Sequence, residues 1–95
     1  MQYESRELTS QVIAHSRIAK RHPDISEEDV RNAWSAALVI RSRAPRRPEE
    51  YASMGFDRKG RPLEMVGVRL EGGEWLVFHA KTPPTKKMLK ELGLI

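Results

Sequence analysis

The spacing of apolar residues near the start of the chain predicts an amphipathic helix from about Thr9 or Ser10 to Arg21. One face of this helix would carry side chains at helical spacing, namely Leu8, Val12, His15, Ala19 and His22, with Ile18 beside them. Pro23 marks its end, because the residue before a proline is biased away from helical backbone angles.

A second helix is predicted directly after this turn. Ser26 is a natural N-cap, and Asp29 stands at the third helical position, where an acidic side chain comes close to a capping box. Ile25 and Val30 flank the cap as a hydrophobic staple. The stripe that follows has the spacing of a buried helical face and consists of Val30, Ala33, Trp34, Ala37 and Leu38.

The pattern changes after Ile40 and predicts strands. Arg41 and Arg43 fit a short edge strand that runs into an exposed loop, since Pro45 and Pro48 exclude a helix interior. Three strands should follow, joined by turns at 57–60 and 71–74: Tyr51–Phe56, with Ala52, Met54 and Phe56 on one face, Pro62–Leu70 and Trp75–Lys81. The middle strand has a mixed apolar pattern, which indicates burial on both faces or a bulge near Met65 and Val66.

The last segment is predicted to be a helix, with Thr82 as its cap, Pro83 as its first residue and Gly93 at its end. Its apolar stripe consists of Thr85, Met88, Leu89 and Leu92. Strands joined by tight turns form an antiparallel meander. The expected fold class is therefore α+β, a single domain over residues 1–95 with two N-terminal helices, a three- to four-stranded antiparallel sheet and a C-terminal helix.

Composition narrows the class of protein. The 95 residues are 39% hydrophobic and 32% charged, which fits one globular domain with a modest core. The chain has no cysteine, which excludes disulfides and thiolate metal sites. Its start lacks the apolar run of a signal peptide, and no apolar stretch approaches the ~20 residues that a membrane span needs. We therefore expect a cytoplasmic protein with no membrane partner.

The net charge of +4 is unevenly distributed. Residues 1–38 hold five Lys and Arg against six Asp and Glu, whereas residues 39–95 hold twelve against seven. A positive second half suggests a polyanion such as nucleic acid, or an acidic protein partner. The alternative is a basic surface that only keeps the protein soluble.

Four short motifs occur in order between Ile13 and Leu89. They are Lys20–Val30, a basic turn before an acidic helix start, then Met54-Gly55, Gly60-Arg61-Pro62-Leu63, and Phe78-His79-Ala80-Lys81-Thr82. In this order and spacing they resemble the motifs of BrnT-like toxins, a branch of the RelE/ParE superfamily of type II toxin–antitoxin pairs. His15-Ser16 also resembles the His-Ala pair of related short domains. The resemblance implies a RelE/BrnT-like fold and a ribonuclease that inhibits translation without a metal or cofactor.

The chain departs from the family pattern at four positions. Pro23 replaces a usual glycine, Glu50 and Leu76 stand where these toxins tend to carry arginine, and His79 occupies a serine-type position. The loss of two arginines favours an alternative, a degenerate toxin that acts as a non-catalytic nucleic-acid- or protein-binding module. Inhibition of a topoisomerase, as in ParE-like toxins, is a third hypothesis.

In RelE-type ribonucleases a ribose 2′-hydroxyl attacks the adjacent phosphate, which requires a base, an acid and cations. The candidate catalytic residues are His79, Lys81, His15 and Arg61. Histidine changes its charge near neutral pH, so His79 is the leading acid or base, and strand alternation places it with Trp75, Val77 and Lys81. Lys81 would hold the phosphate, and His15 would assist from the first helix. The alternative for both histidines is a structural role, and His22 is expected to close the turn.

The candidate RNA-binding residues are the basic side chains Arg41, Arg43, Arg58, Lys59, Lys86 and Lys87. Contacts from such side chains to the RNA backbone would depend on salt and not on base sequence, and the alternative for each is a solvated surface. No metal site is expected, because two histidines seven residues apart lack helical metal-pair spacing. The expected partners are a cognate antitoxin and RNA, including RNA associated with the ribosome. The expected assemblies are a homodimer or a heterotetramer with the antitoxin.

Overall fold

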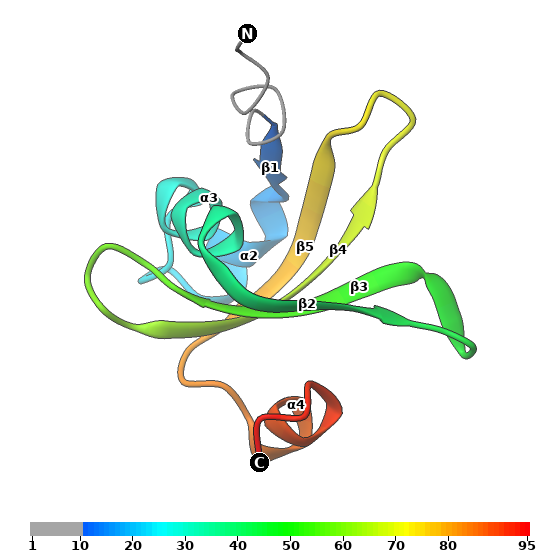
Figure 1. Ribbon diagram of the computed structural model, residues 1–95. Helices are drawn as coiled ribbons and strands as arrows, with labels where there is room; N and C mark the ends of the chain where they lie inside the picture. The colour runs from blue at the N-terminus through cyan, green and yellow to red at the C-terminus, as the bar shows by residue number, and fades with distance from the viewer. Residues whose placement is uncertain (1–10) are drawn as a thin grey trace, which may run out of the picture.

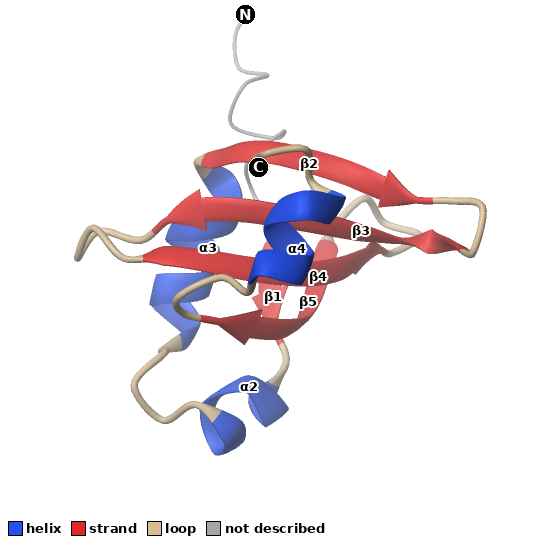
Figure 2. Cartoon of the chain, turned by 90° about the horizontal axis from the view of Figure 1, so that it is seen from below, coloured by secondary structure: helices blue, strands red, loops and turns tan. Residues whose placement is uncertain are grey.

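The computed structural model describes residues 11–95, which form a five-stranded mixed sheet with helices on both faces (Figure 1). The strand order is β1-β5-β4-β3-β2. Helices α2 and α3 cover one face, and helix α4 lies across the other (Figure 2). The α+β class and the C-terminal helix agree with the sequence pattern. The sheet is larger than the three or four strands expected, and it is mixed because the first strand pairs in parallel.

The first described element is a strand where a helix was expected. Strand β1 (Val12–Ala14) runs parallel to β5, and helix α2 (Ser16–Arg21) begins only after it. The prediction of one helix up to Arg21 is therefore wrong for residues 12–14, while Leu8, Thr9 and Ser10 lie outside the described residues. Pairing decides the outcome: the backbone N–H of His15 donates to the carbonyl oxygen of Val77 at 2.8 Å. Long-range pairing of this kind overrides a local helical period.

Helix α3 (Glu27–Ser35) begins as the sequence predicts. The Ser26 hydroxyl accepts from the Asp29 N–H at 3.0 Å, and the Asp29 carboxylate accepts from the Ser26 N–H at 2.9 Å, which completes a capping box. Val30, Ala33 and Trp34 are buried against the sheet. The helix ends before Ala37, so this part of the expected stripe is wrong.

Ala37 and Leu38 instead open strand β2 (Ala37–Arg43), the edge of the sheet. Leu38 is 63% exposed. An apolar run of this length fits a helix end and a strand start equally well by periodicity alone. The β-branched pair Val39 and Ile40 favours the strand, and the expected edge strand therefore starts before Arg41.

Strands β3 (Arg47–Phe56), β4 (Pro62–Arg69) and β5 (Trp75–Lys81) form an antiparallel meander with β2, as the tight turns predict. Strand β4 is buried on both faces: Leu63 and Met65 join the core beneath α2 and α3, and Val66 joins a second core beneath α4. Burial on both faces is thus confirmed for this strand.

A register shift between β4 and β5 changes which side chains share a face. Val66 pairs with His79 while Gly67 pairs with Val77, so Phe78 is an extra residue in β5. Val77 and Ala80 both pack in the core of α2 and α3, so the two residues between them, Phe78 and His79, lie on the face beneath α4. Simple alternation predicts that His79 shares a face with Trp75 and Val77, and this prediction is wrong because of the bulge.

Helix α4 (Lys86–Glu91) is capped by Thr85, whose hydroxyl accepts from the Met88 N–H at 3.1 Å. Thr82 is not the cap: its hydroxyl donates to the carbonyl oxygen of Pro62, and Pro83 precedes a second proline that disfavours helical angles. The side chains of Met88 and Leu92 are buried in the second core, between α4 and the sheet. Gly93 ends the helix with a positive φ of 76°. Within residues 11–95, no helix combines the length and apolar character needed to cross a membrane.

Candidate active site

Two adjoining cavities open between the sheet and α4. The smaller, about 310 Å³, is called here the His79 pocket and is lined chiefly by Arg17, Glu64, Phe78, His79, Thr85 and Lys87. The larger, about 870 Å³, is called the arginine cleft, and its charged lining consists of Arg41, Arg43, Arg46, Arg47, Glu50, Lys87 and Glu91. The two share the residues Arg43, Phe78, Lys87 and Glu91, so they form one continuous depression.

His79 is hydrogen-bonded to a buried carboxylate in the smaller cavity. Its Nε2 lies 2.8 Å from Oε2 of Glu64, whose side chain is only 6% exposed, while the His79 side chain is 35% exposed. The other carboxylate oxygen, Oε1, accepts from the N–H of Thr85 at 2.7 Å and from its hydroxyl at 2.9 Å. The N-cap of α4 and the histidine of β5 are thus joined through one carboxylate.

The environment of Glu64 favours its ionised form. Burial alone would raise the pKa of this carboxyl, but the hydrogen bonds from His79 and Thr85 outweigh burial, and the pKa lies below its ordinary value of 4.5. Glu64 is therefore a carboxylate at neutral pH. An ionised carboxylate only accepts hydrogen bonds, which restricts the proton positions on its neighbours.

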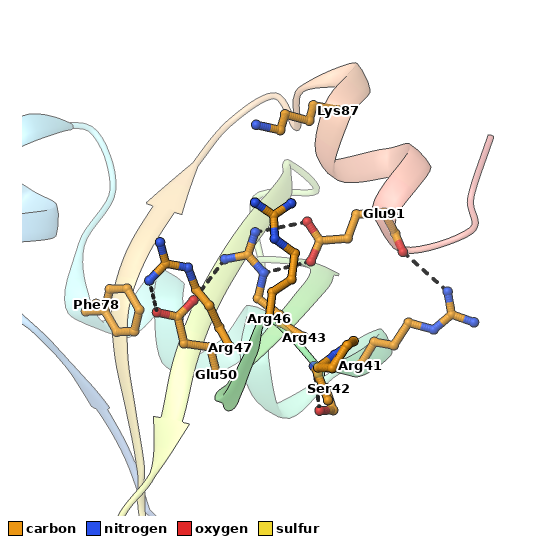
Figure 3. A pocket seen from close by; sticks show the side chains of 11 residues that line it. Arg41, Ser42, Arg43, Arg46, Arg47, Glu50, Phe78, Lys87 and Glu91 are labelled. Atoms are coloured by element: carbon orange, nitrogen blue, oxygen red, sulfur yellow. Dashed lines mark hydrogen bonds and ion pairs between the residues drawn. The ribbon is translucent and has the colours of Figure 1, made fainter.

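Cations and one aromatic ring surround the pair. The guanidinium of Arg17 lies 5.9 Å from the centre of the Phe78 ring. The bulge in β5 places His79 on the same side of the sheet as Phe78. Lys87, on α4, lines both cavities, and Figure 3 shows its side chain without an ion pair to the residues drawn.

The arginine cleft is partly neutralised from within (Figure 3). Arg43 donates to both oxygens of Glu91, at 2.7 and 3.0 Å, and to Glu50 at 3.0 Å. The hydrogen bonds to Glu91 raise the pKa of Arg43, although its partial burial acts in the opposite direction. Arg47 approaches Glu50 at 4.0 Å. The lining of the cleft holds five cations and two carboxylates, so its net charge is positive. Among the described residues, Arg46 and Lys87 have no carboxylate within ion-pair distance.

The structure brings together only some of the residues that the sequence singled out. His79, Arg41, Arg43 and Lys87 line the depression. Lys81 pairs across the strands with Glu64 but lines neither cavity. Lys86 is exposed on α4 and also lies outside.

His15 and Arg61 do not converge on His79. His15 is the N-cap of α2, not a residue within a helix, and its Nδ1 accepts from the Arg17 N–H at 3.0 Å. Arg61 is held by three carboxylates, at 2.9 Å from Asp57, 3.1 Å from Asp29 and 3.2 Å from Asp24. Its guanidinium is occupied in joining the β3–β4 turn to α3, which removes it from the candidate site.

Arg58 and Lys59 belong to that same turn. Lys59 donates to Asp29 at 3.2 Å, and Arg58 is exposed in the turn. Neither residue lines the depression. The position of this turn therefore gives no support to the prediction that Arg58 and Lys59 contact RNA bound at His79.

Several site residues were missed by the sequence analysis. Arg17, Glu64, Phe78 and Thr85 line the His79 pocket, and Arg46 and Arg47, which the sequence placed in an exposed loop, line the cleft. One signal was present: Glu64 is an acidic residue inside the apolar run of β4. A charged residue is almost never buried unless it is paired. The acid therefore indicated a partner across the sheet.

Comparisons with known proteins add one partial similarity. The chain is 39% identical over 80 residues to the cell division protein FtsA of Enterococcus hirae. The match covers 76% of this chain and 18% of that protein, so the chain corresponds to a small part of its length. No family model matches the chain, and no solved structure matches it.

Among residues 11–95, no three His, Asp or Glu side chains are grouped as a metal site would require.

Proposed function

We propose that the protein is the toxin of a type II toxin–antitoxin pair and cleaves single-stranded RNA in the His79 pocket, without a metal. The observation that carries the proposal is a partly exposed histidine, held by a buried carboxylate, in a cavity rimmed by cations. A general acid–base group beside positive charge is what cleavage by a 2′-hydroxyl needs. The order of motifs that resembles BrnT-like toxins supports the same class.

In this reaction His79 takes the proton from the 2′-hydroxyl, and the 2′-oxygen attacks the adjacent phosphorus. The bond from phosphorus to the 5′-oxygen breaks, which leaves a 2′,3′-cyclic phosphate and a 5′-hydroxyl that takes its proton from solvent. Lys87 and Arg17 lie where they can stabilise the negative charge that builds on the phosphate oxygens. Every group in the step belongs to this chain, to RNA or to water.

The adjoining cleft supplies a path for the rest of the strand. Arg41, Arg46 and Arg47 line it beside the His79 pocket, and backbone phosphates are natural partners for such arginines. A single strand can bend into this depression and present its 2′-hydroxyl to His79, whereas a duplex holds its backbone in a fixed helical path.

The test is cleavage of a labelled single-stranded RNA by the purified protein, freed of any antitoxin, in the presence of a metal chelator. His79→Ala should lose at least about 100-fold in rate, because an acid–base group contributes about 10²- to 10⁴-fold. The matched control is His15→Ala, a histidine outside the depression, which should cleave normally. An inactive wild-type protein, or a His79→Ala variant as active as wild type, would refute the proposal.

A wider test is growth after induced expression in bacteria, at matched protein levels. The proposal expects arrest by the wild-type protein, relief by His79→Ala and neutralisation by a co-expressed antitoxin. RNA binding without cleavage would favour the alternative of a non-catalytic module. Arrest with blocked DNA supercoiling and intact RNA would favour the ParE-like alternative.

A second candidate follows from the similarity to the cell division protein of Enterococcus hirae, which favours a contact with the division machinery. It predicts a different phenotype. Cells expressing the wild-type protein or His79→Ala would both grow into filaments, because such a contact does not need an acid–base group. Arrest that depends on His79 would exclude this candidate.

A further inference from the structure

We propose that Glu64 is a positioning residue that fixes His79 with its proton on Nε2, so that Nδ1 is the ring nitrogen that accepts a proton. The tautomer follows from geometry alone. Its consequence for catalysis rests on the proposed function, and the two parts are tested by separate measurements.

The hydrogen bonds around Glu64 leave no freedom in the placement of protons. Oε1 receives two donors from Thr85, the backbone N–H at 2.7 Å and the hydroxyl at 2.9 Å. The same hydroxyl accepts from the Met88 N–H, so its own proton points toward Glu64. Within residues 11–95, the hydrogen-bond partner of Oε2 is Nε2 of His79, at 2.8 Å. Because a carboxylate only accepts, Nε2 must carry a proton.

The second ring nitrogen is then the basic one. Among the described residues, the hydrogen bonds of His79 involve Nε2 and not Nδ1. A neutral imidazole with Nε2 protonated carries its lone pair on Nδ1. A buried carboxylate that orients a histidine in this way is a recurring device in hydrolases that use a histidine base.

Glu64→Gln tests this arrangement because the amide has one acceptor and one donor end. The Thr85 N–H can only donate, so the amide oxygen must face Thr85 and the amide NH₂ must face His79. Nε2 then has to accept, which moves the ring proton to Nδ1. The substitution preserves the size of the side chain and removes one negative charge. It also changes which ring nitrogen of His79 can accept a proton, from Nδ1 to Nε2.

The experiment is long-range ¹H–¹⁵N correlation spectroscopy of the histidine rings in the uniformly labelled 95-residue chain, recorded at alkaline pH. Wild type should show His79 with the proton on Nε2, and Glu64→Gln should show it on Nδ1. His15 is the internal control: its Nδ1 accepts from Arg17, so its proton should stay on Nε2 in both spectra. A wild-type His79 with its proton on Nδ1 overturns the proposal, and the wild-type spectrum decides even if the variant does not fold.

The consequence for activity is measured on the same two proteins. Glu64→Gln should slow RNA cleavage by about 100-fold or more, the range of an acid–base group, while circular dichroism shows the fold retained. Unchanged cleavage by a variant with an inverted tautomer overturns the positioning role. If wild type does not cut RNA but shows the expected tautomers, the proposed function fails and the assignment of the ring proton stands.

Discussion

The Nε atom of Arg43 lies 2.7 Å from Oε2 of Glu91, a contact that ties the edge strand β2 to helix α4. A second hydrogen bond, from Nη2 to Oε1 at 3.0 Å, makes the pair bidentate. Arg41 adds a hydrogen bond to the backbone carbonyl of the same glutamate at 3.3 Å. Because Arg43 and Glu91 line both cavities, this pair forms the boundary between the His79 pocket and the arginine cleft.

Loss of this pair should loosen α4. Glu91→Gln is expected to lower the free energy of unfolding by about 1 kcal/mol, the upper range for a partly exposed ion pair with bidentate geometry. Arg43→Lys should cost a similar amount, because an ammonium cannot reproduce the planar fork. Urea denaturation measures both changes.

The control for this measurement is the pair Arg31–Glu27 on α3, at 3.6 Å, whose side chains are 47% and 63% exposed. Glu27→Gln should leave the urea midpoint almost unchanged, since exposed pairs contribute little. Equal effects of Glu27→Gln and Glu91→Gln would contradict a structural role for the Arg43–Glu91 contact.

The stability of the protein should fall in acid through Asp29. Burial acts to raise the pKa of this carboxyl, but hydrogen bonds from Ser26 and Lys59 outweigh it, so the folded-state pKa lies below the ordinary value of 3.8. A carboxyl with a lowered pKa stabilises the fold above the unfolded-state pKa, and this stabilisation is lost as pH falls through the folded-state pKa. Asp29→Asn should therefore lower the melting temperature near neutral pH and flatten its decline in acid.

Thermal unfolding followed from neutral pH to below the pKa of an ordinary aspartate measures this effect. Asp24→Asn is the matched control, because the Asp24 side chain is 65% exposed. It should keep the wild-type dependence on pH. An Asp29→Asn variant with the same acid slope as wild type would show that other carboxyls dominate.

The parts of the fold that were predicted correctly are coded by neighbouring residues. The capping box joins Ser26 to Asp29, three residues apart. The turns at Gly60 and Gly73 place glycine where φ is positive, at 83° and 94°, and the bounds of β5 follow the apolar run between a turn and a proline. Local sequence suffices for such features because all the interacting atoms lie within a few positions.

The features that were missed depend on residues far apart in the chain. β1 exists as a strand because Val12 pairs with Trp75. His79 lies on the α4 face of the sheet, and not on the face of Val77, because β5 contains one extra residue, Phe78. The candidate site likewise combines Arg17 from α2 with Lys87 from α4. The sequence identified His79 and Lys87 as residue types suited to RNA, but it could not show which other side chains lie beside them.

A close approach of α3 to the sheet makes Gly55 sensitive to substitution. A Cβ at this position would overlap the carbonyl oxygen of Ala33 and lie 3.0 Å from the Cα of Ala37. Gly55→Ala should therefore lower the free energy of unfolding by about 2 kcal/mol or more, as expected when backbone atoms must move in a packed core.

Gly72→Ala is the control for this prediction. The atoms nearest to a Cβ at Gly72 belong to the side chain of Glu74, the closest at 2.7 Å, and that side chain can rotate away. Chemical denaturation of the two variants should give a large loss for Gly55→Ala and a small one for Gly72→Ala. A Gly55→Ala protein as stable as wild type would contradict the close packing of α3 on β3.

Two adjacent lysines allow a sharp test of where RNA runs. Lys87 lines both cavities, whereas Lys86 is exposed on the same helix and lines neither. Binding of a fluorescent 2′-O-methyl oligoribonucleotide, which lacks the attacking hydroxyl and cannot be cut, is measured by anisotropy over a range of salt concentrations. Lys87→Gln should weaken binding and reduce the slope of log K against log salt by about 0.7, the value for one lost phosphate contact on a single strand.

Lys86→Gln removes the same charge from the neighbouring position and should leave this slope close to that of wild type. The comparison separates a specific contact from general attraction, because both variants have the same net charge and the same helix composition. Equal loss of affinity in the two variants would mean that RNA is held by the overall positive field. Loss confined to Lys87→Gln would place the backbone of the strand between α4 and the sheet, beside His79.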